Sequence, residues 1–533
     1  MTAVVVIGIS ADARAANAPS RVRPRSSPSP RRVGGVGRET LPRPAGRIPV
    51  RSSTIIGSDL AAVALPGDRP PPSRSRSKAT RGATPLAPVS TSGFDALSGS
   101  RHHPADPTGA LGDTNVVTAV NTKVAVYDRN GTVVHDAVSL ARLAAGIEGQ
   151  KFDPKIVYDQ YRQTFVLVFL IRDARAKRSR IIVTTIPDNT ASNDATWCTT
   201  IMRGDAVSKN GRQWADYPGL GYDANSVTIS TNAFNFGGGL AYAQLYHIAD
   251  TELFAPCDPA DRVRFHVFAG DETRDPDGSK GFTIQPAQTV GASTVQHLLS
   301  YDTSGFVVVW RIRDGSKAPW LSRSAIKVRR AQVAPFGTQR GGGYRDDDTW
   351  WDPGDLRLVN AFYDTALNRI YAAHAILRDL KPDPIVPYVE AAVRWYEVRP
   401  TRRLGSSTIT RTGIVGRSET DAGWPVLATD AGGNLFVAYN RASKPRGEYL
   451  SAWVAEIAPG AAAASSTLLG AGESRFEAID NRPERWGDFN AINRDATDGS
   501  VVAVVNQYAR DDGKAPAGVT KTWQQTFDLV SDG

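Results

Sequence analysis

Residues 216–229 read Asp-Tyr-Pro-Gly-Leu-Gly-Tyr-Asp-Ala-Asn-Ser-Val-Thr-Ile, and this stretch decides the fold class. One apolar run ends at Asp223, Ala224 and Asn225 follow, and a second apolar run begins at Ser226. Short runs rich in β-branched and aromatic residues, separated by Asp and Asn, are typical of antiparallel strands joined by tight turns. The stretch therefore predicts a β-hairpin.

The same hairpin pattern recurs along the chain with an Asp at each turn. These aspartates are at positions 159, 223, 302, 364, 430 and 495, separated by 64, 79, 62, 66 and 65 residues. A weaker copy over 113–121 precedes them. Such intervals suit one four-stranded unit with loops, and repetition of the unit around a channel buries both faces of each sheet.

We therefore predict an all-β chain that folds as a single β-propeller of about seven four-stranded blades over residues 93–533. A propeller of about six blades is the main alternative. A pair of β-sandwiches fits the constant spacing less well.

The N-terminal part has a different composition. Residues 19–92 are rich in Arg, Pro and Ser, which predicts a disordered tail. Residues 1–88 hold 15 Lys and Arg against 4 Asp and Glu, whereas the whole chain has a net charge of +9, so the folded part is nearly neutral. A nucleic-acid partner is not expected, because the positive charge is not clustered on a folded domain.

Residues 1–18 contain an apolar run from Ala3 to Ile9, followed by small-residue sites like those at the end of a secretory signal. No Lys or Arg precedes the run. We expect a signal-peptide remnant here and hence a secreted or cell-surface protein. No later stretch reaches the ~20 apolar residues that a membrane span needs, and we expect a monomer.

Two further predictions concern a disulfide bond and a calcium site, and each has an alternative. Cys198 and Cys257 are an even, low count compatible with one disulfide after export, and two buried thiols are the alternative. Asp271, Asp275 and Asp277 lie in an acidic loop that is a weak calcium candidate, although a solvated turn is favoured. No cofactor is expected, with calcium as the alternative.

Trp, Asp and Arg gather at the expected starts of several inner strands. In a propeller these starts surround one mouth of the channel, where aromatic rings stack on sugars, carboxylates accept from hydroxyls and guanidinium groups bind acids. The candidate ligand-binding residues are Trp214, Asp216, Asp352, Asp355, Arg357, Arg485, Trp486 and Asp488. The alternative is structural: Trp fills space between blades while Asp fastens turns and pairs with Arg.

Four stretches resemble a family of bacterial secreted, sialidase-like β-propeller proteins, most of which have no assigned activity. The stretches are Asp106–Gly112 with 125–128, 216–218 with 230–234, 393–398, and 485–489 with 505–508. The resemblance implies the fold and export. The Asp box of sialidases, Ser-x-Asp-x-Gly-x-Thr-Trp, is not matched, so no sialidase catalytic residue is transferred to this chain.

Metalloprotease, phosphate-loop, Cys-x-x-Cys and nucleophile-elbow motifs are absent from the sequence. We therefore expect a binding module for an extracellular glycan or protein, and whether it is an enzyme stays open. The alternative is a sialidase-like glycoside hydrolase acting at the same mouth, which requires two carboxyl groups with different protonation states.

Overall fold

The computed structural model describes residues 50–56, 87–99, 103–205, 213–258, 260, 262–315, 318–340, 350–378, 389–461, 463–478, 483–513 and 519–533. The predicted signal remnant over 1–18 and most of the predicted tail over 19–92 lie outside these residues. The described chain is nearly all β, as predicted, and its few helices are single turns.

Four consecutive antiparallel strands form the repeated unit. The first groups are β3 (Thr108–Leu111), β4 (Asn115–Val120), β5 (Lys123–Asp128) and β6 (Val133–Ser139); β7 (Gln150–Asp159), β8 (Thr164–Asp173), β9 (Arg178–Pro187) and β10 (Cys198–Arg203); and β11 (Gln213–Tyr222), β12 (Ser226–Asn235), β13 (Leu240–Ala249) and β14 (Arg262–Ala269). Residues 216–229 thus form most of β11 and the start of β12, and these two strands pair as the predicted hairpin.

The next groups repeat this order. They are β15 (Gln285–Val290), β16 (Val295–Asp302), β17 (Phe306–Arg313) and β18 (Trp320–Lys327); β21 (Ala361–Asp364), β22 (Arg369–Leu377), β23 (Ala391–Arg399) and β24 (Thr408–Val415); and β25 (Asp421–Thr429), β26 (Leu435–Ser443), β27 (Glu448–Ile457) and β28 (Ser465–Gly470). A further sheet joins β31 (Ala491–Arg494), β32 (Val502–Arg510), β34 (Thr522–Ser531) and β2 (Val89–Gly99).

Several short elements are present in addition to these four-stranded sheets. They are the strands β19 (Gly337–Thr338), β20 (Trp350–Asp352), β29 (Arg475–Phe476), β30 (Glu484–Arg485) and β33 (Val519–Thr520), the helices α1 (Leu140–Leu143) and α2 (Asp250–Leu253), and 3-10 turns at Asp188–Thr190, Asp194–Thr196 and Leu404–Ser406. No helix among the described residues is long and apolar enough to cross a membrane.

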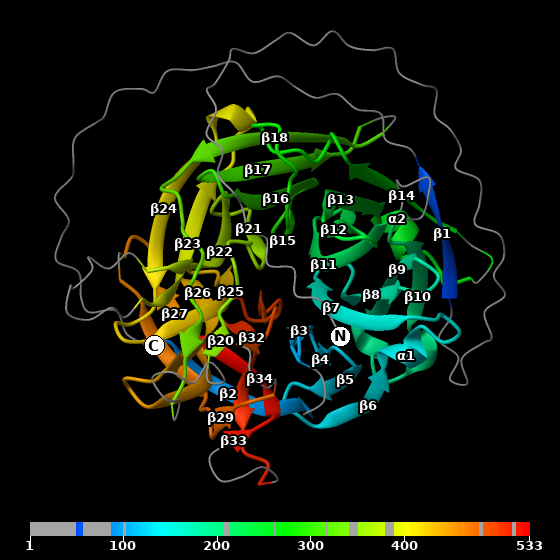
Figure 1. Ribbon diagram of the computed structural model, residues 1–533. Coiled ribbons are helices and arrows are strands. Elements are labelled where there is room, and N and C mark those ends of the chain that lie inside the picture. Colours follow the sequence, from blue (N-terminus) through cyan, green and yellow to red (C-terminus); the bar gives the residue numbers. More distant parts are fainter. Residues whose placement is uncertain are drawn as a thin grey trace.

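The sheets are arranged around a common centre, as in a β-propeller (Figure 1). The first strand of a group lies innermost, as β11, β15 and β21 show, and the last strand, such as β14, β18 or β24, lies at the outside. Neighbouring inner strands run in the same direction, because β15 pairs in parallel with both β11 and β21. All inner strands of this kind therefore begin at the same end of the ring.

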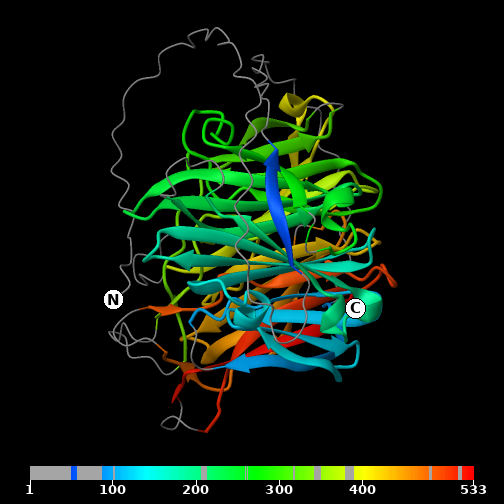
Figure 2. The same cartoon turned by 90° about the vertical axis from the view of Figure 1, so that its right-hand side faces the viewer.

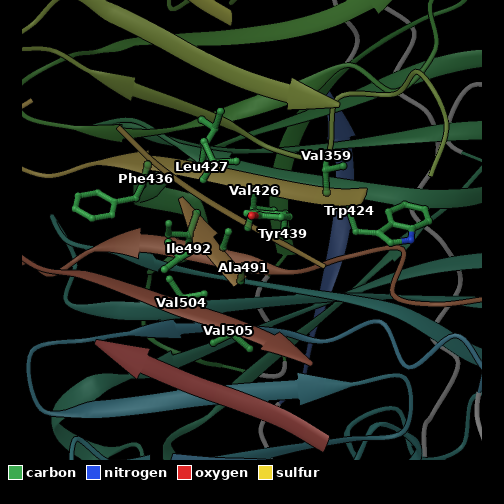
Figure 3. Packing of buried hydrophobic residues seen from close by; sticks show 14 of the residues in the cluster. Val359, Trp424, Val426, Leu427, Phe436, Tyr439, Ala491, Ile492, Val504 and Val505 are labelled. Carbon is green, nitrogen blue, oxygen red and sulfur yellow. The ribbon is translucent and has the colours of Figure 1, made fainter. Parts of the chain in front are cut away.

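Burial explains which sequences occupy which strand. Every residue of β26 is buried, whereas exposed and half-buried residues alternate along β24. A strand covered on both faces needs apolar residues along its length, while an outer strand with one solvated face alternates. Figure 3 shows Val426 and Leu427 of β25 packing with Ile492 of β31 and Val504 of β32, so the core is continuous between adjacent sheets.

Glycine allows the innermost strands to approach one another. A Cβ on Gly221 in β11 would clash with the carbonyl oxygen of Ala287 in β15. A Cβ on Gly219 would meet the side chains of Ser230 and Gln285. The Gly-Leu-Gly segment of the opening stretch is therefore needed for close packing at the centre.

The repeated turn aspartates hold the turns after the inner strands. Asp159 accepts a hydrogen bond from the Tyr161 backbone N–H at 2.9 Å, and Asp223 accepts one from the Asn225 N–H at 2.8 Å. Asp302 and Asp495 likewise accept from the N–H two residues further on, whereas Asp364 accepts from the Leu367 N–H and Asp430 from the Asn434 N–H. This carboxylate capping of a turn explains why the spacing of Asp reports the spacing of the sheets.

Two features connect different groups. Cys198 at the start of β10 and Cys257 after α2 form a disulfide, with their Cα atoms 5.9 Å apart. The strand β1 (Val50–Ile56) pairs in parallel with β10 and β14, along the outer side of the ring (Figure 2).

The last sheet contains both ends of the folded chain. β2 pairs antiparallel with β34, from Val89 opposite Ser531 to Gly99 opposite Trp523. The C-terminal strand expected from the sequence is thus present as β34. The predicted domain boundary at residue 93 falls inside β2, because the polar residues Ser90 to Gly93 pair through their backbone although their side chains resemble the tail.

We predict that limited proteolysis of the whole protein leaves a resistant fragment that begins N-terminal to Val89. Cleavage within β2 would remove the ladder to β34 and the packing of Leu97, which is 5% exposed. Mass spectrometry of the fragment gives its first residue. A stable fragment that begins between residues 93 and 99 would contradict this role of β2.

Candidate functional site

An unusual backbone conformation marks the starts of the inner strands. Asp106, Asp153, Tyr217 and Trp424 have φ angles of 52°, 53°, 52° and 49°, and each of them precedes a proline. Residues other than glycine rarely adopt positive φ, at a cost of about 1–3 kcal/mol each, and keep it where the surrounding structure imposes it. The ladders of β7, β11 and β25 are irregular at this point, so each strand bulges as it enters the ring.

Tyr217 connects three of these strand starts. Its backbone N–H donates to Asp153 Oδ2 at 3.0 Å, and its hydroxyl donates to the Asp488 carbonyl oxygen at 3.0 Å. Its ring lies 4.7 Å from the ring of Phe489. Residues that are hundreds of positions apart in the sequence therefore meet at one mouth of the central channel.

Arg357 is held by its own neighbour at this mouth. Its Nε and Nη2 donate to the two oxygens of Asp355, both at 2.7 Å. The guanidinium also lies over the ring of Tyr217, at 4.2 Å, and near Phe282, at 5.2 Å. Burial opposes ionisation of Asp355, but the charge of Arg357 prevails and lowers the pKa of that carboxyl.

Arg485 pairs with Asp488 in the same way. The side chain of Arg485 is 49% exposed and that of Asp488 is 12% exposed, so the pair lies at the solvent boundary of the mouth. The charge of Asp488 raises the pKa of Arg485 further.

Asp216 is a carboxylate at this mouth whose side chain has no hydrogen-bond donor among the described residues. Among the described residues its side chain makes no hydrogen bond to the protein, and the residue is only partly buried. Burial raises its pKa to about 6; Arg357 opposes this rise and Asp488 adds to it. The Asp216 carboxylate therefore keeps acceptor positions that no described residue uses.

Below the mouth lies a second group of ionisable side chains, which includes Asp106 and Lys155. Asp106 is 1% exposed and Lys155 is 7% exposed. Asn121 links Asp106 to Asp153. The Asn121 side-chain nitrogen donates to Asp106, and the Asn121 side-chain oxygen accepts from the Asp153 backbone N–H at 2.7 Å. Lys155 Nζ lies 4.1 Å from the centre of the Phe489 ring.

Burial dominates the protonation of this layer. It raises the pKa of Asp153 to about 8, with Asp216 and Asp488 adding to the shift, and it raises the pKa of Asp106 well above its usual range. It lowers the pKa of Lys155 to about 7, although Asp106 and Asp153 favour the charged amine. The pKa values of Asp106 and Asp153 are therefore raised by burial, whereas that of Asp355 at the same mouth is lowered.

The channel below the mouth is narrow and polar. A cavity of about 20 Å³ is lined by Lys155, Gln285, Asn360, Asn490 and apolar residues of the inner strands. The Gln285 amide nitrogen and the Asn490 side-chain oxygen have no hydrogen-bond partner among the described residues. Such a volume is enough for roughly one water molecule.

The structure brings six of the eight predicted ligand-binding residues to this mouth. They are Asp216, Asp352, Asp355, Arg357, Arg485 and Asp488, which interact electrostatically. Asp352 accepts from the Gly354 N–H at 2.9 Å, and burial raises its pKa.

The two tryptophans differ from the expectation of open stacking surfaces. Trp486 is 1% exposed and packs edge-on against Phe476 with ring centres 4.8 Å apart, so its ring is part of the core. Trp214 is partly buried, with the Arg172 guanidinium 4.2 Å from its ring and Phe234 at 5.6 Å. The ring of Trp486 is not open to a sugar, as the space-filling alternative expects, whereas Trp214 is half-buried and has Arg172 over its ring.

Sequence reasoning did not select Asp106, Asp153, Lys155 or Tyr217. A usable signal is the residue-proline pair that opens several inner strands, at 106–107, 153–154, 217–218 and 424–425. The protonation of these groups was not readable from the sequence, because burial is its first cause.

The calcium candidates do not converge on one point. Asp271 is 91% exposed on its side chain and pairs with Arg274, while Asp277 accepts from the Ser279 N–H. In the part of the chain that the structure describes, no three His, Cys, Asp or Glu side chains are placed to hold a metal ion. Asp275 is buried, its Oδ1 has no hydrogen-bond partner among the described residues, and burial raises its pKa to about 7.

Comparisons with known proteins show distant likenesses only. No protein-family profile and no curated protein matches the chain. A Trypanosoma rangeli sialidase mutant with trans-sialidase activity is 11% identical, with a TM-score of 0.33 over 77% of this chain and 57% of the sialidase chain. A Penicillium chrysogenum α-L-arabinanase bound to arabinobiose is 10% identical, with a TM-score of 0.35 over 84% of this chain and 99% of its own. A Dyadobacter fermentans protein of unknown function is 10% identical, with a TM-score of 0.34. Scores this low assign no activity and no residue role to this chain.

We predict that Trp486→Ala lowers the free energy of unfolding by about 3–5 kcal/mol, as removal of a buried aromatic side chain does. Trp214→Ala should cost less, because Trp214 is partly exposed. Thermal unfolding of both variants beside the parent protein measures the difference. Equal destabilisation by the two substitutions would contradict the core role of Trp486.

We also predict that Asp153→Asn changes how stability depends on pH. Between its ordinary pKa of 3.8 and about 8, folded Asp153 holds a proton that the unfolded chain has released, so stability falls as pH rises. Asn removes this contribution, and its oxygen can still accept from Tyr217.

The melting temperature of Asp153→Asn minus that of the parent should therefore increase from about pH 5 to about pH 7. The pH range of the test ends at about 7 because the pKa of Lys155 is lowered to about 7, so the titration of Lys155 also changes stability above this pH. A difference that stays constant or decreases over this range would show that Asp153 is ionised in the folded protein.

Proposed function

We propose that this protein is an exported, seven-bladed β-propeller that binds a carbohydrate at the mouth formed by Asp216, Arg357, Arg485 and Asp488. The observation that carries the proposal is the carboxylate of the half-buried Asp216, which has no hydrogen-bond donor among the described residues. Sugar hydroxyls donate to carboxylates and accept from guanidinium groups, and both kinds of group flank this position.

Two further features support the proposal. The sheet of β31, β32, β34 and β2 supplies the last blade, since β2 fills the outer position. The Cys198–Cys257 disulfide is compatible with an oxidising compartment, where such bonds persist.

Glycoside hydrolysis is the second candidate, and one observation favours it. Asp153 has a pKa raised to about 8, whereas the pKa of Asp355 is lowered, so a protonated and an ionised carboxyl group occur at the same mouth. Glycosidases use such a pair as general acid and as nucleophile or base. In this reading Asp153 donates a proton to the leaving oxygen.

The test is retention of the whole protein on a panel of immobilised neutral and charged glycans. Asp216→Asn should weaken retention about tenfold or more, because it removes the charge of the free acceptor. Asp271→Asn is the matched control, since the same chemical change falls on a 91% exposed side chain outside the mouth. Thermal unfolding confirms that both variants fold.

A parent protein that retains no glycan, or equal retention by Asp216→Asn and the parent, would contradict binding at this mouth. Release of reducing ends from a bound glycan, lost in Asp153→Asn while binding persists, would show hydrolysis. Binding without release would leave the protein a binding module.

A further inference from the structure

Three basic side chains lie together on β16 and β17, at the end of the ring opposite to the mouth. His297 in β16 pairs with Arg311 in β17, and Arg313 follows two residues later on the same face of the sheet. The start of β16 follows the end of the inner strand β15, whereas the mouth surrounds the starts of the inner strands. This group is therefore separate from the proposed carbohydrate site.

The neighbouring sheet covers two of these side chains. Arg311 Nη1 donates to the carbonyl oxygens of Thr401 at 3.2 Å and Arg402 at 3.1 Å, in the loop that follows β23. The ring of His297 lies 4.6 Å from the ring of Tyr363 in β21. As a result Arg311 is 8% exposed and His297 is 6% exposed.

Each member of the group has a nitrogen atom without a partner. Arg311 Nε, Arg313 Nε and His297 Nδ1 are buried and have no hydrogen-bond partner among the described residues. The Arg313 residue as a whole is half-buried. Buried polar atoms without partners are costly, so native proteins supply a protein group, a water molecule or a ligand.

The group also has no counter-ion in the part of the chain that the structure describes. Burial and the charge of Arg313 lower the pKa of Arg311 to about 10, and no described carboxylate opposes the shift. Burial, followed by the charges of Arg311 and Arg313, lowers the pKa of His297 to about 3, so the imidazole is neutral. The next acid along the chain, Asp314, is bonded to His247 at 3.2 Å. Two like charges thus lie close together without an acid between them.

The charge of the group decides which anion fits. A guanidinium binds carboxylate or phosphate oxygens through parallel N–H groups. A carboxylate has a single negative charge, whereas a dianionic phosphate balances two guanidinium groups and has oxygens for the donors of both. Arg402 and Arg403 in the adjoining loop are exposed and add positive charge beside the group.

We propose that Arg311, Arg313 and His297 form a second binding site, which takes a dianionic phosphate group. The free Nε–H groups of the two arginines donate to phosphate oxygens, and the neutral imidazole donates through Nδ1. This inference goes beyond the proposed function, because the two sites share no residue and lie at opposite ends of the ring.

The experiment measures anion binding to the whole protein by calorimetry at about pH 8, where phosphate is a dianion, with chloride keeping the ionic strength constant. The probes are inorganic phosphate, sulfate, glucose 6-phosphate and acetate. Phosphate and sulfate should bind at least about tenfold more tightly than acetate. Binding of glucose 6-phosphate would show that the phosphate group of a larger ligand is accepted, and its failure to bind beside inorganic phosphate would identify a site for the free anion.

Arg313→Gln is the decisive variant, because Arg313 makes no side-chain hydrogen bond to described residues, whereas Arg311 also holds the loop at Thr401. It should weaken phosphate binding about tenfold or more. Arg264→Gln is the matched control, since its side chain is 63% exposed and pairs with Glu252. Residues 19–92 are the same in all variants, so phosphate bound by their arginines does not affect the comparison.

Thermal unfolding separates a binding role from a structural one. Without phosphate, Arg313→Gln should melt at the temperature of the parent or above it, because the substitution removes repulsion of Arg311. Phosphate should raise the melting temperature of the parent and of Arg264→Gln, but not that of Arg313→Gln. A lower melting temperature of Arg313→Gln without phosphate, together with unchanged phosphate binding, would show a structural role.

Three further results would overturn this site. They are the absence of phosphate binding by the parent, equal binding of phosphate by the parent and Arg313→Gln, and binding of acetate as tight as that of phosphate. None of them bears on the carbohydrate proposal, which is tested with Asp216→Asn at the other end of the ring.

Discussion

Burial of both faces of every sheet is the constraint on which the rest of this structure depends. A four-stranded sheet with apolar residues on both faces has no stable form alone, so each one requires a neighbour on either side. The requirement is met in full only when the first and last sheets also have neighbours. Pairing of β2 with β34 fills the outer position of the last sheet and holds the two ends of the folded chain together. The mouth exists for the same reason, because Asp216, Arg357 and Asp488 become neighbours through the ring and not through the sequence.

The two ends of an inner strand differ in chemistry. At one end the aspartates repeat, since each accepts a hydrogen bond from a backbone N–H of the turn that follows it. At the other end the side chains vary from strand to strand and include Asp153, Tyr217 and Trp424 on a shared backbone conformation. Repetition therefore identifies residues that hold the turns, whereas the side chains on the shared positive-φ backbone differ from strand to strand.

These differences explain what could be predicted from the sequence. Strands, hairpins and turn aspartates are local features, so their spacing predicted an all-β repeat architecture and the end of the ring at which the candidate site lies. The exposure of an aromatic ring is not local: Trp214 and Trp486 stand in similar sequence contexts, yet Trp486 is 1% exposed and Trp214 is partly exposed. The pKa shifts of Asp106, Asp153 and Lys155 depend on burial by distant strands, which no short motif encodes.

The position of β2 has a consequence for biosynthesis. Val89 is among the first residues of the folded region to leave the ribosome, and its partner Ser531 is among the last. A contact over this sequence distance carries a large loop-closure entropy and is typical of slow folding. Until β34 is synthesised, β2 has an unpaired edge, and exposed strand edges of this kind can pair with other chains.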